Sequence, residues 1–421
     1  MKIVRRVLCL LILLFVFTEN TVALEDLNLV GTHSIALDYQ TDEIIYADNI
    51  YDKIQIASIT KLMTALLFAE NKNKNDELIY TEAAFAQPPY AYRTQIHPVK
   101  VGDKVIAEDA MDMLLIYSAN DIAYMIGDNV AGDSHSFIEM MDDKAKKLGM
   151  MDTKFATLNG LDDEEGKSYS TTYDVALLCK AALENEWVKS SLSKAEAQVS
   201  FIQGASAVLE TRNKLLGVDG NIAGKTGYTS LAGRCLISLY ERDGRQIIGI
   251  VMNSLYDFPK DTQVFEDMEK LIDYSYEAEK TLVHEKGKEF EKITVEYSPA
   301  AFLGFIKREI DLPLILKENI ELYDVDLNIE LTTITEDPAD IHVWNVKKDT
   351  ILGKVIVQQG RNKMEFNLVT SLTKKDLILR NIHFYIISFV VAVFLLILIL
   401  RIINKIRRNS PKYRRYNSRY K

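Results

Sequence analysis

The sequence contains few of the residues that bind metals or cross-link a chain. Among 421 residues there are three cysteines and six histidines, and the histidines are scattered without paired spacing. His284-Glu285 begins a zinc-peptidase pattern, but Lys288 stands where the second histidine would be needed. The sequence also lacks a glycine-rich phosphate loop, a Gly-x-Ser-x-Gly motif and internal repeats. We therefore expect no metal and no nucleotide cofactor.

Charge is unevenly distributed along the chain. The formal net charge is −10, yet residues 401–421 carry nine Lys or Arg and no acid, and residues 1–24 carry a net charge of +2. Residues 25–400 therefore carry −21. A body this acidic is not expected to bind nucleic acid.

The first residues have the three parts of a secretory signal peptide. Lys2, Arg5 and Arg6 precede a short apolar run, and Thr21-Val22-Ala23 offers a small-residue cleavage site. We predict a signal peptide at residues 1–23; an uncleaved anchor is the alternative. The apolar run is too short to span a bilayer comfortably.

A second apolar run lies near the other end. Residues 382–403 are apolar apart from His383, Ser388 and Arg401, which is the length that a transmembrane helix needs. Because the basic residues begin at its end, the positive-inside rule places the tail, residues 404–421, in the cytoplasm. The alternative, a buried core helix, fits poorly beside so many like charges. The sequence thus predicts a single-pass protein of the cell membrane whose residues 24–380 lie outside the cell.

Two cysteines remain in the exported part. Cys179 lies in an apolar helical stretch and Cys235 in an apolar strand pattern. They could pair, but we expect two buried free thiols, since a domain of this size needs no disulfide.

The pattern along the chain predicts an α+β fold. A hairpin is expected at residues 34–47, helices at 59–70, 110–130 and 136–148, strands at 224–230, 234–240 and 246–253, and a closing helix at 265–276. The Asp243-Gly244 pair between apolar runs is a strong hairpin signal. Strands at both ends with helices between them indicate one sheet made from distant segments and covered by helices. After it, residues 285–370 read as a small β domain with short strands around 293–295, 327–329, 341–343 and 354–357.

Ser58-Ile59-Thr60-Lys61 has the spacing that activates a serine. Residues three apart on a helix share a face, so Lys61 is expected one turn from Ser58. A partly desolvated lysine loses its proton and serves as the base that a serine hydroxyl needs. Alone, this tetrad is a weak signal, because an exposed surface helix explains most examples.

Two further segments make the pattern specific. Ser118-Ala119-Asn120 supplies a hydroxyl and an amide two residues apart, and alone it would be read as a helix cap or turn. Lys225-Thr226-Gly227 begins a predicted strand, where Gly227 permits the close approach of an extended peptide. Lys225 can offset a carboxylate or polarise Ser118. In this order, with these gaps and in an exported chain, the three segments together are a specific signal.

The chain resembles the low-molecular-mass penicillin-binding proteins, the S11 family of D-Ala-D-Ala carboxypeptidases. The resemblance covers roughly residues 25–280 and rests on the three motifs and on Asn159-Gly160-Leu161-Asp162 and Tyr169-Ser170-Thr171. It implies a β-lactamase/transpeptidase-like catalytic domain at residues 24–280, an antiparallel sheet covered by helices, followed by the β domain and the membrane helix. It also implies peptidoglycan stem peptides ending in D-Ala-D-Ala as substrates, and β-lactam antibiotics as ligands.

The resemblance further implies roles for the site residues. Ser58 would be acylated, Lys61 would be its general base, and Ser118 would pass a proton to the leaving amine. Asn120 and Lys225 would hold Ser118. The backbone N–H groups of Ser58 and Tyr228 would form the oxyanion hole beside Gly227, and Thr226 would contact the terminal carboxylate of the substrate.

One departure from the family concerns that carboxylate. Members often carry an Arg before a Phe on the closing helix, and here Val264-Phe265 aligns with that pair. Lys260 is one possible substitute; Thr226 and Lys225 are the other. Two rival functions also stay open at this point: a β-lactamase, for which no convincing Glu-x-x-x-Asn segment is found between residues 118 and 225, and a catalytically weak wall-binding protein.

Overall fold

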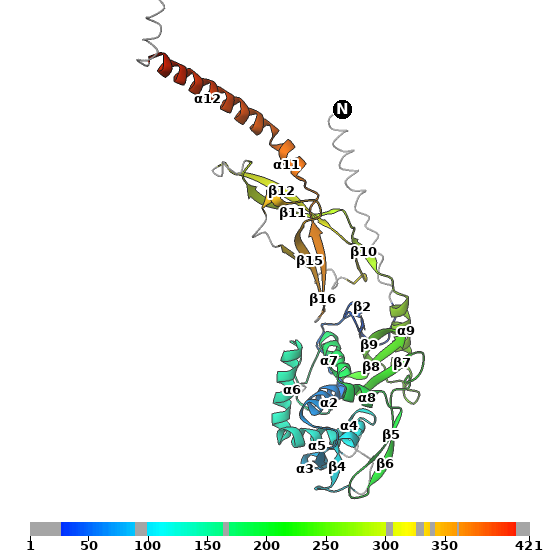
Figure 1. Cartoon of the computed structure of the whole chain (residues 1–421). Helices are drawn as coiled ribbons and strands as arrows, with labels where there is room; N and C mark the ends of the chain where they lie inside the picture. Colours follow the sequence, from blue (N-terminus) through cyan, green and yellow to red (C-terminus); the bar gives the residue numbers. More distant parts are fainter. Residues whose placement is uncertain are drawn as a thin grey trace, which may run out of the picture. The chain divides into compact units, whose positions relative to one another are not determined.

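The computed structural model describes residues 27–88, 99–162, 168–299, 306–325, 332–336, 342–359 and 362–409. They form two compact units (Figure 1). The first runs to Thr281 and takes in Leu322–Leu331 and Gln359–Asn362 from later in the chain; the second contains the remainder. The expected signal peptide and most of the basic tail lie outside the described residues.

The first unit is built on a five-stranded antiparallel sheet with strand order β2-β1-β9-β8-β7. The strands are β1 (His33–Asp38), β2 (Ile44–Asp48), β7 (Asn221–Thr229), β8 (Gly233–Arg242) and β9 (Arg245–Ser254). Asp243 and Gly244 have φ of 52° and 81°, which the tight turn between β8 and β9 requires. The predicted sheet made from distant segments is confirmed, and β7 forms one of its edges.

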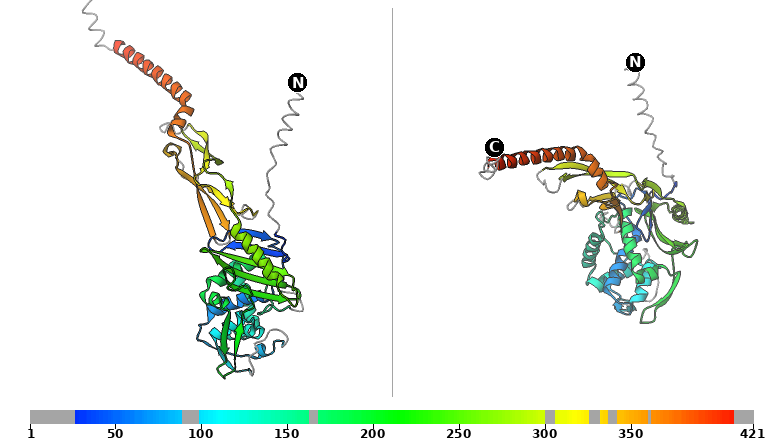
Figure 2. Two further views of the ribbon diagram at one scale, coloured as in Figure 1. Left: turned by 90° about the vertical axis from the view of Figure 1, so that its right-hand side faces the viewer. Right: turned by 45° about the horizontal axis from the view of Figure 1, so that its top comes forward.

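Helices cover both faces of this sheet (Figures 1 and 2). Helix α9 packs against β1, β2, β8 and β9, while α2 lies at the centre of a cluster formed by α4 to α8. Adding a Cβ at Gly249 of β9 would bring it within 2.6 Å of the Met268 sulfur, so α9 lies close to the strand. The helices are η1 (Ala57–Thr60), α2 (Lys61–Asn71), α3 (Glu82–Phe85), α4 (Ala107–Leu115), α5 (Asn120–Ala131), α6 (Ser134–Leu148), α7 (Thr172–Glu184), α8 (Glu186–Leu192) and α9 (Gln263–Glu277).

The prediction of one continuous helical stretch over residues 110–130 is wrong. Helix α4 ends at Leu115 and α5 begins at Asn120. Ser118 between them has φ of 68°, a left-handed conformation that a right-handed helix cannot contain. Two hairpins were also not anticipated: β3 (Glu77–Ile79) with β4 (Lys104–Ile106), and β5 (Glu196–Ser200) with β6 (Ser206–Glu210).

Cys179 and Cys235 are both buried and free, as expected. Burial raises the pKa of the Cys179 thiol to about 12 and that of Cys235 to about 11. The thiolate forms are therefore disfavoured, and neither cysteine is a nucleophile.

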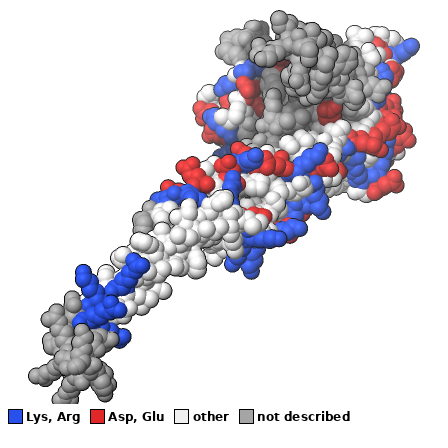
Figure 3. Space-filling view, turned by 90° about the horizontal axis from the view of Figure 1, so that it is seen from above, with Lys and Arg blue, Asp and Glu red and all other residues white. Residues whose placement is uncertain are grey.

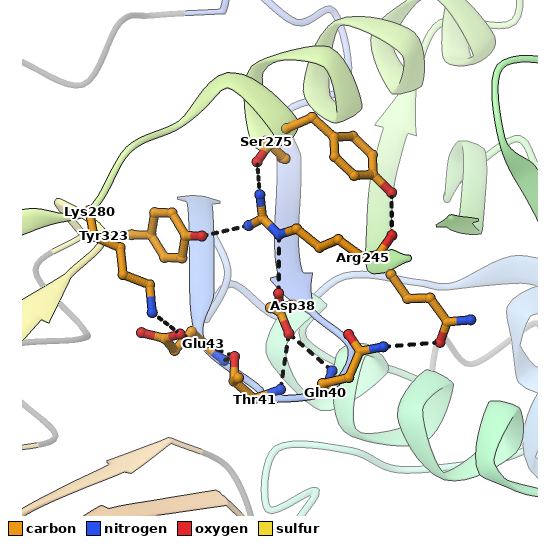
Figure 4. A network of polar contacts seen from close by, with 10 residues as sticks. Asp38, Gln40, Thr41, Glu43, Arg245, Ser275, Lys280 and Tyr323 are labelled. Atoms are coloured by element: carbon orange, nitrogen blue, oxygen red, sulfur yellow. Dashed lines mark hydrogen bonds and ion pairs between the residues drawn. The ribbon is translucent and has the colours of Figure 1, made fainter. Parts of the chain in front are cut away.

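A polar network holds a late segment of the chain in the first unit (Figure 4). Arg245 donates to Asp38 Oδ2 at 3.2 Å, to the Ser275 carbonyl at 3.4 Å and to the Tyr323 hydroxyl at 2.5 Å. Lys280 pairs with the buried Glu43. Tyr323 is buried in the same hydrophobic core, so part of the expected 285–370 segment belongs with the first unit.

The second unit contains a five-stranded sheet of order β11-β12-β16-β15-β14. The described residues of the strand expected at 341–343 are not in a strand, since Val343 begins a 3-10 turn, η3 (Val343–Asn345). Trp344 of this turn donates to the Ser298 carbonyl at 2.7 Å. The expected strand at 327–329 lies outside the described residues. The strands are β10 (Thr281–His284), β11 (Glu289–Tyr297), β12 (Arg308–Leu316), β13 (Ile320–Leu322), β14 (Thr332–Glu336), β15 (Ile351–Gln359) and β16 (Asn362–Val369).

Two helices follow this sheet, α11 (Lys374–Arg380) and α12 (Ile382–Asn409). Within Ile382–Arg408, an 18-residue window has a mean hydropathy of 3.2 and none of its residues is buried, so α12 is long and apolar enough to cross a membrane. Figure 3 shows a long uncharged stretch that ends in Lys and Arg. The basic residues of α12 are Arg401, Lys405, Arg407 and Arg408. A buried core helix would instead be covered by protein.

Candidate active site

Ser58 and Lys61 lie where η1 continues into α2. Ala57 has φ of 46°, an uncommon conformation for a residue with a side chain, and it precedes the half-buried Ser58. Leu62, Met63 and Leu66 of the predicted apolar stripe are buried, which fixes the helix in the core. Lys61 is fully buried, and its Nζ lies 2.9 Å from Ser58 Oγ.

The Lys61 amine has two further polar neighbours. Its Nζ lies 2.7 Å from Asn120 Oδ1 and 2.7 Å from the Asn159 carbonyl oxygen. Burial lowers the pKa of Lys61 well below 10.5; nearby Asp121 opposes this shift and Arg212 adds to it. A neutral amine has two N–H donors and one lone pair. In that neutral form the two asparagine oxygens, which are acceptors only, would take both N–H groups and leave the lone pair for the Ser58 hydroxyl.

Ser118 lies between α4 and α5 in a left-handed backbone conformation, and its hydroxyl faces Lys225 of β7. Lys225 Nζ donates to Ser118 Oγ at 2.8 Å and to the Thr226 carbonyl at 2.8 Å. Lys225 is buried, and burial lowers its pKa well below 10.5, with the charge of Lys61 as the next cause. Two amines in one buried site therefore disfavour each other's protonation.

The outer edge of β7 borders the site, because β8 is its only strand neighbour among the described residues. A Cβ added at Gly227 would lie 3.1 Å from the Ser58 backbone nitrogen and 3.2 Å from Ala57 Cβ. Only a residue without a side chain lets β7 and η1 approach this closely. Tyr228 follows, with its side chain 40% exposed.

The three segments line one cleft of about 450 Å³. Six of the eight expected site residues border it directly, while Lys61 and Lys225 lie behind its wall and reach Ser58 and Ser118 by hydrogen bonds. The expected residues along the cleft are Ser58, Ser118, Asn120, Thr226, Gly227 and Tyr228. Within the described part of the chain, no group of three His, Cys, Asp or Glu side chains gathers as metal ligands do.

Several contributors to this site had no assigned role from sequence. The Asn159 carbonyl binds Lys61, and Gly160 has φ of 76°, where a Cβ would come within 1.8 Å of the Ala57 carbonyl oxygen. The family resemblance included the stretch that contains these two residues. The role of the Asn159 carbonyl could not be predicted, because every residue has a backbone carbonyl. Arg212 and Arg234 also line the cleft, and neither lies in a motif.

The two residues considered for the missing arginine are not at this cleft. Val264 is fully buried, and Lys260 is exposed and does not line it. Positive charge at the rim comes from Arg212 and Arg234 instead.

Comparison with known proteins supports the resemblance. Bacillus subtilis D-alanyl-D-alanine carboxypeptidase DacF is 23% identical over 331 residues, which are 77% of this chain and 81% of that protein. Escherichia coli D-alanyl-D-alanine carboxypeptidase DacC is 31% identical over 253 residues, 58% of this chain and 60% of that protein. The chain thus matches less than two thirds of the E. coli protein.

A solved structure has the same fold in its matched part. Penicillin-binding protein D2 of Listeria monocytogenes, in its cefotaxime-bound form, has a TM-score of 0.52 and 30% identity, covering 59% of this chain and 98% of that one. A family model described as D-alanyl-D-alanine carboxypeptidase, peptidase S11, matches residues 19–255, more than half of the chain. The chain therefore belongs to the S11 family of D-alanyl-D-alanine carboxypeptidases.

Proposed function

We propose that the protein is a serine-type D-Ala-D-Ala carboxypeptidase that removes the terminal D-Ala from peptidoglycan stem pentapeptides. The observation that carries this proposal is the position of the Lys61 amine. It is buried, it is hydrogen-bonded to two asparagine oxygens, and it lies 2.9 Å from the Ser58 hydroxyl at an open cleft. Such an amine is prepared to remove a proton from Ser58. The relatives' names supply the substrate class.

The first half of the reaction acylates Ser58. The stem peptide lies extended along the free edge of β7, and Ser58 Oγ attacks the carbonyl carbon between the last two D-alanines while its proton passes to Lys61. The oxyanion that forms faces the backbone N–H groups of Ser58 and Tyr228, each worth about 3 kcal/mol in comparable sites. Ser118 gives its proton to the nitrogen of the departing D-Ala and is reprotonated with the proton that Lys61 took from Ser58, so that Lys61 is neutral again at the end of this half.

The second half releases the product. Water attacks the ester on Ser58 while the neutral Lys61 takes a proton from it, and Lys61 returns that proton to Ser58 Oγ as the ester bond breaks. The peptide leaves one residue shorter, with a new terminal carboxylate. Asn120 positions Lys61 and the substrate, and Lys225 holds Ser118. A β-lactam mimics the terminal dipeptide and leaves a slowly hydrolysed ester on Ser58; the cefotaxime-bound Listeria relative supports this ligand class.

The full-length protein tests the assignment. Wild type should release D-Ala from a peptide ending in D-Ala-D-Ala and should be labelled by fluorescent penicillin. Ser58→Ala should do neither while keeping the wild-type melting temperature. A folded Ser58→Ala protein that still becomes labelled would show that another residue is the nucleophile. Turnover of nitrocefin much faster than D-Ala release would favour a β-lactamase instead.

We further propose that α12 anchors the protein with residues 24–380 outside the cell and residues 404–421 inside, and that residues 285–370 form mainly a separate β domain. The apolar length of α12 and the basic residues at its end support this orientation. Protease added to intact cells should remove the catalytic domain and spare an epitope placed after residue 421. Loss of that epitope in intact cells would reverse the topology.

A further inference from the structure

A substrate with a free carboxylate needs a cation at the cleft, and the position where the family often places one is apolar here. This inference rests on the proposed function, since it concerns how the terminal D-Ala is recognised. Val264 is fully buried, so no charge is available from that position. Lys225 lies behind the wall and is already bound to Ser118 Oγ and the Thr226 carbonyl. Among the described residues, the cations that line the cleft are Arg212 and Arg234.

Arg234 occupies the better position of the two. It is on β8 directly opposite Tyr228 of β7, so it belongs to the same end of the sheet as Thr226 and Gly227. Its side chain is 10% exposed and lines the cleft. Its guanidinium lies 5.9 Å from the ring centres of both Tyr256 and Phe265, which hold the planar group in place.

The hydrogen bonds of Arg234 are incomplete. Nη2 donates to Asp261 Oδ2 at 2.5 Å, but the buried Nε has no partner among the described residues, and neither has Asp261 Oδ1. A guanidinium has five N–H donors and binds a carboxylate through two of them in parallel. A buried donor without an acceptor is costly, so the unpaired Nε leaves Arg234 able to donate to a further acceptor, such as a carboxylate.

Arg212 is committed elsewhere. Its Nε donates to the Tyr117 carbonyl at 3.0 Å, and its guanidinium stacks over the Tyr117 ring at 4.9 Å. These contacts place it beside the turn that carries Ser118. We propose that Arg234 binds the terminal carboxylate of the substrate, replacing the arginine that is missing at position 264, with Asp261 orienting it.

The test compares two substrates on one preparation of the full-length protein: a peptide ending in D-Ala-D-Ala and the same peptide with a C-terminal amide. The ratio of their kcat/KM values does not depend on how much of the enzyme is active, so partial misfolding does not affect it. Arg234→Gln should lower kcat/KM for the free acid by about 10- to 100-fold, chiefly through KM, because a charge-assisted hydrogen-bonded pair is lost. The amide should be affected little, and the ratio should fall towards one.

Matched variants sharpen the result. Lys260→Gln removes an exposed cation outside the cleft and should leave the ratio unchanged. Asp261→Asn weakens the contact that orients Arg234 and should lower the ratio, but by less than Arg234→Gln does. An unchanged ratio in Arg234→Gln, or a collapse in Arg212→Gln alone, overturns the assignment. Wild-type D-Ala release and labelling of Ser58 report separately on the proposed function, so the two can fail independently.

Discussion

The charge state of Lys61 should control the pH dependence of acylation, and Asn120→Asp tests this. Asn120 Oδ1 lies 2.7 Å from Lys61 Nζ. Aspartate has nearly the same shape, so the substitution places a negative charge next to the amine with little change in packing. An opposite charge this close favours the protonated amine and raises its pKa by about 1–3 units.

The consequence for rate follows from the fraction of neutral amine. On the rising limb of the pH profile, each unit of upward shift lowers the neutral fraction tenfold. Acylation of Asn120→Asp should therefore be about 10- to 1000-fold slower than that of wild type there. In wild type the limb should level off well below pH 10.5, because burial lowers the pKa of Lys61.

The assay is the second-order rate constant for labelling by fluorescent penicillin from pH 6 to 10. Asn120 also borders the cleft, so the substitution is expected to change the plateau as well; the position of the limb is the relevant readout. Asn75→Asp adds the same charge at an exposed turn after α2 and should leave the profile unchanged. A limb at the same pH in Asn120→Asp and wild type would refute Lys61 as the base.

Three further predictions follow from the site. Ser118→Ala should slow D-Ala release by about 10²- to 10⁴-fold, the range of a lost proton-transfer group, and wild-type rates would exclude the relay. Gly160→Ala should abolish penicillin labelling and lower the melting temperature, because its Cβ would overlap the Ala57 carbonyl; an active, stable variant would contradict the observed φ of 76°. Burial lowers the pKa values of Lys61 and Lys225 below 10.5 in the folded protein. Between the folded pKa and 10.5 the unfolded chain therefore binds more protons than the folded chain. The free energy of unfolding should rise with pH in this range, by up to about 1.4 kcal/mol per pH unit for each lysine. In thermal melts at different pH values, the stability of Lys61→Met should rise less steeply with pH than that of wild type. The same slope in both proteins would mean that Lys61 is charged in the folded protein.

Local patterns were sufficient for much of the fold. The Asp243-Gly244 turn and the alternation beside it defined the β8–β9 hairpin, and the apolar spacing after Ser58 defined α2. The free, buried state of Cys179 and Cys235 also followed from their apolar neighbours. These features depend on residues close together in sequence.

Features that depend on distant contacts were missed. The break at Ser118 has φ of 68°, and its hydroxyl is bound by Lys225, 107 residues away. Tyr323 joins the first unit through Arg245, 78 residues away. Arg234 meets Asp261 only because β9 returns the chain to the same end of the sheet. No window of sequence contains both partners of such contacts.

The two buried amines explain how one site can take up a proton and deliver another. In the proposed mechanism, Lys61 becomes charged when Ser58 attacks, and a charge on Lys61 disfavours a proton on Lys225. Lys225 Nζ is 2.8 Å from Ser118 Oγ. A proton shared between Lys225 and Ser118 is therefore released more readily to the departing amine when Lys61 is charged. A single exposed lysine would lack this coupling, because water would screen its charge. Burial of both amines lowers folding stability. In return, the two amines are coupled, because a proton on one of them disfavours a proton on the other.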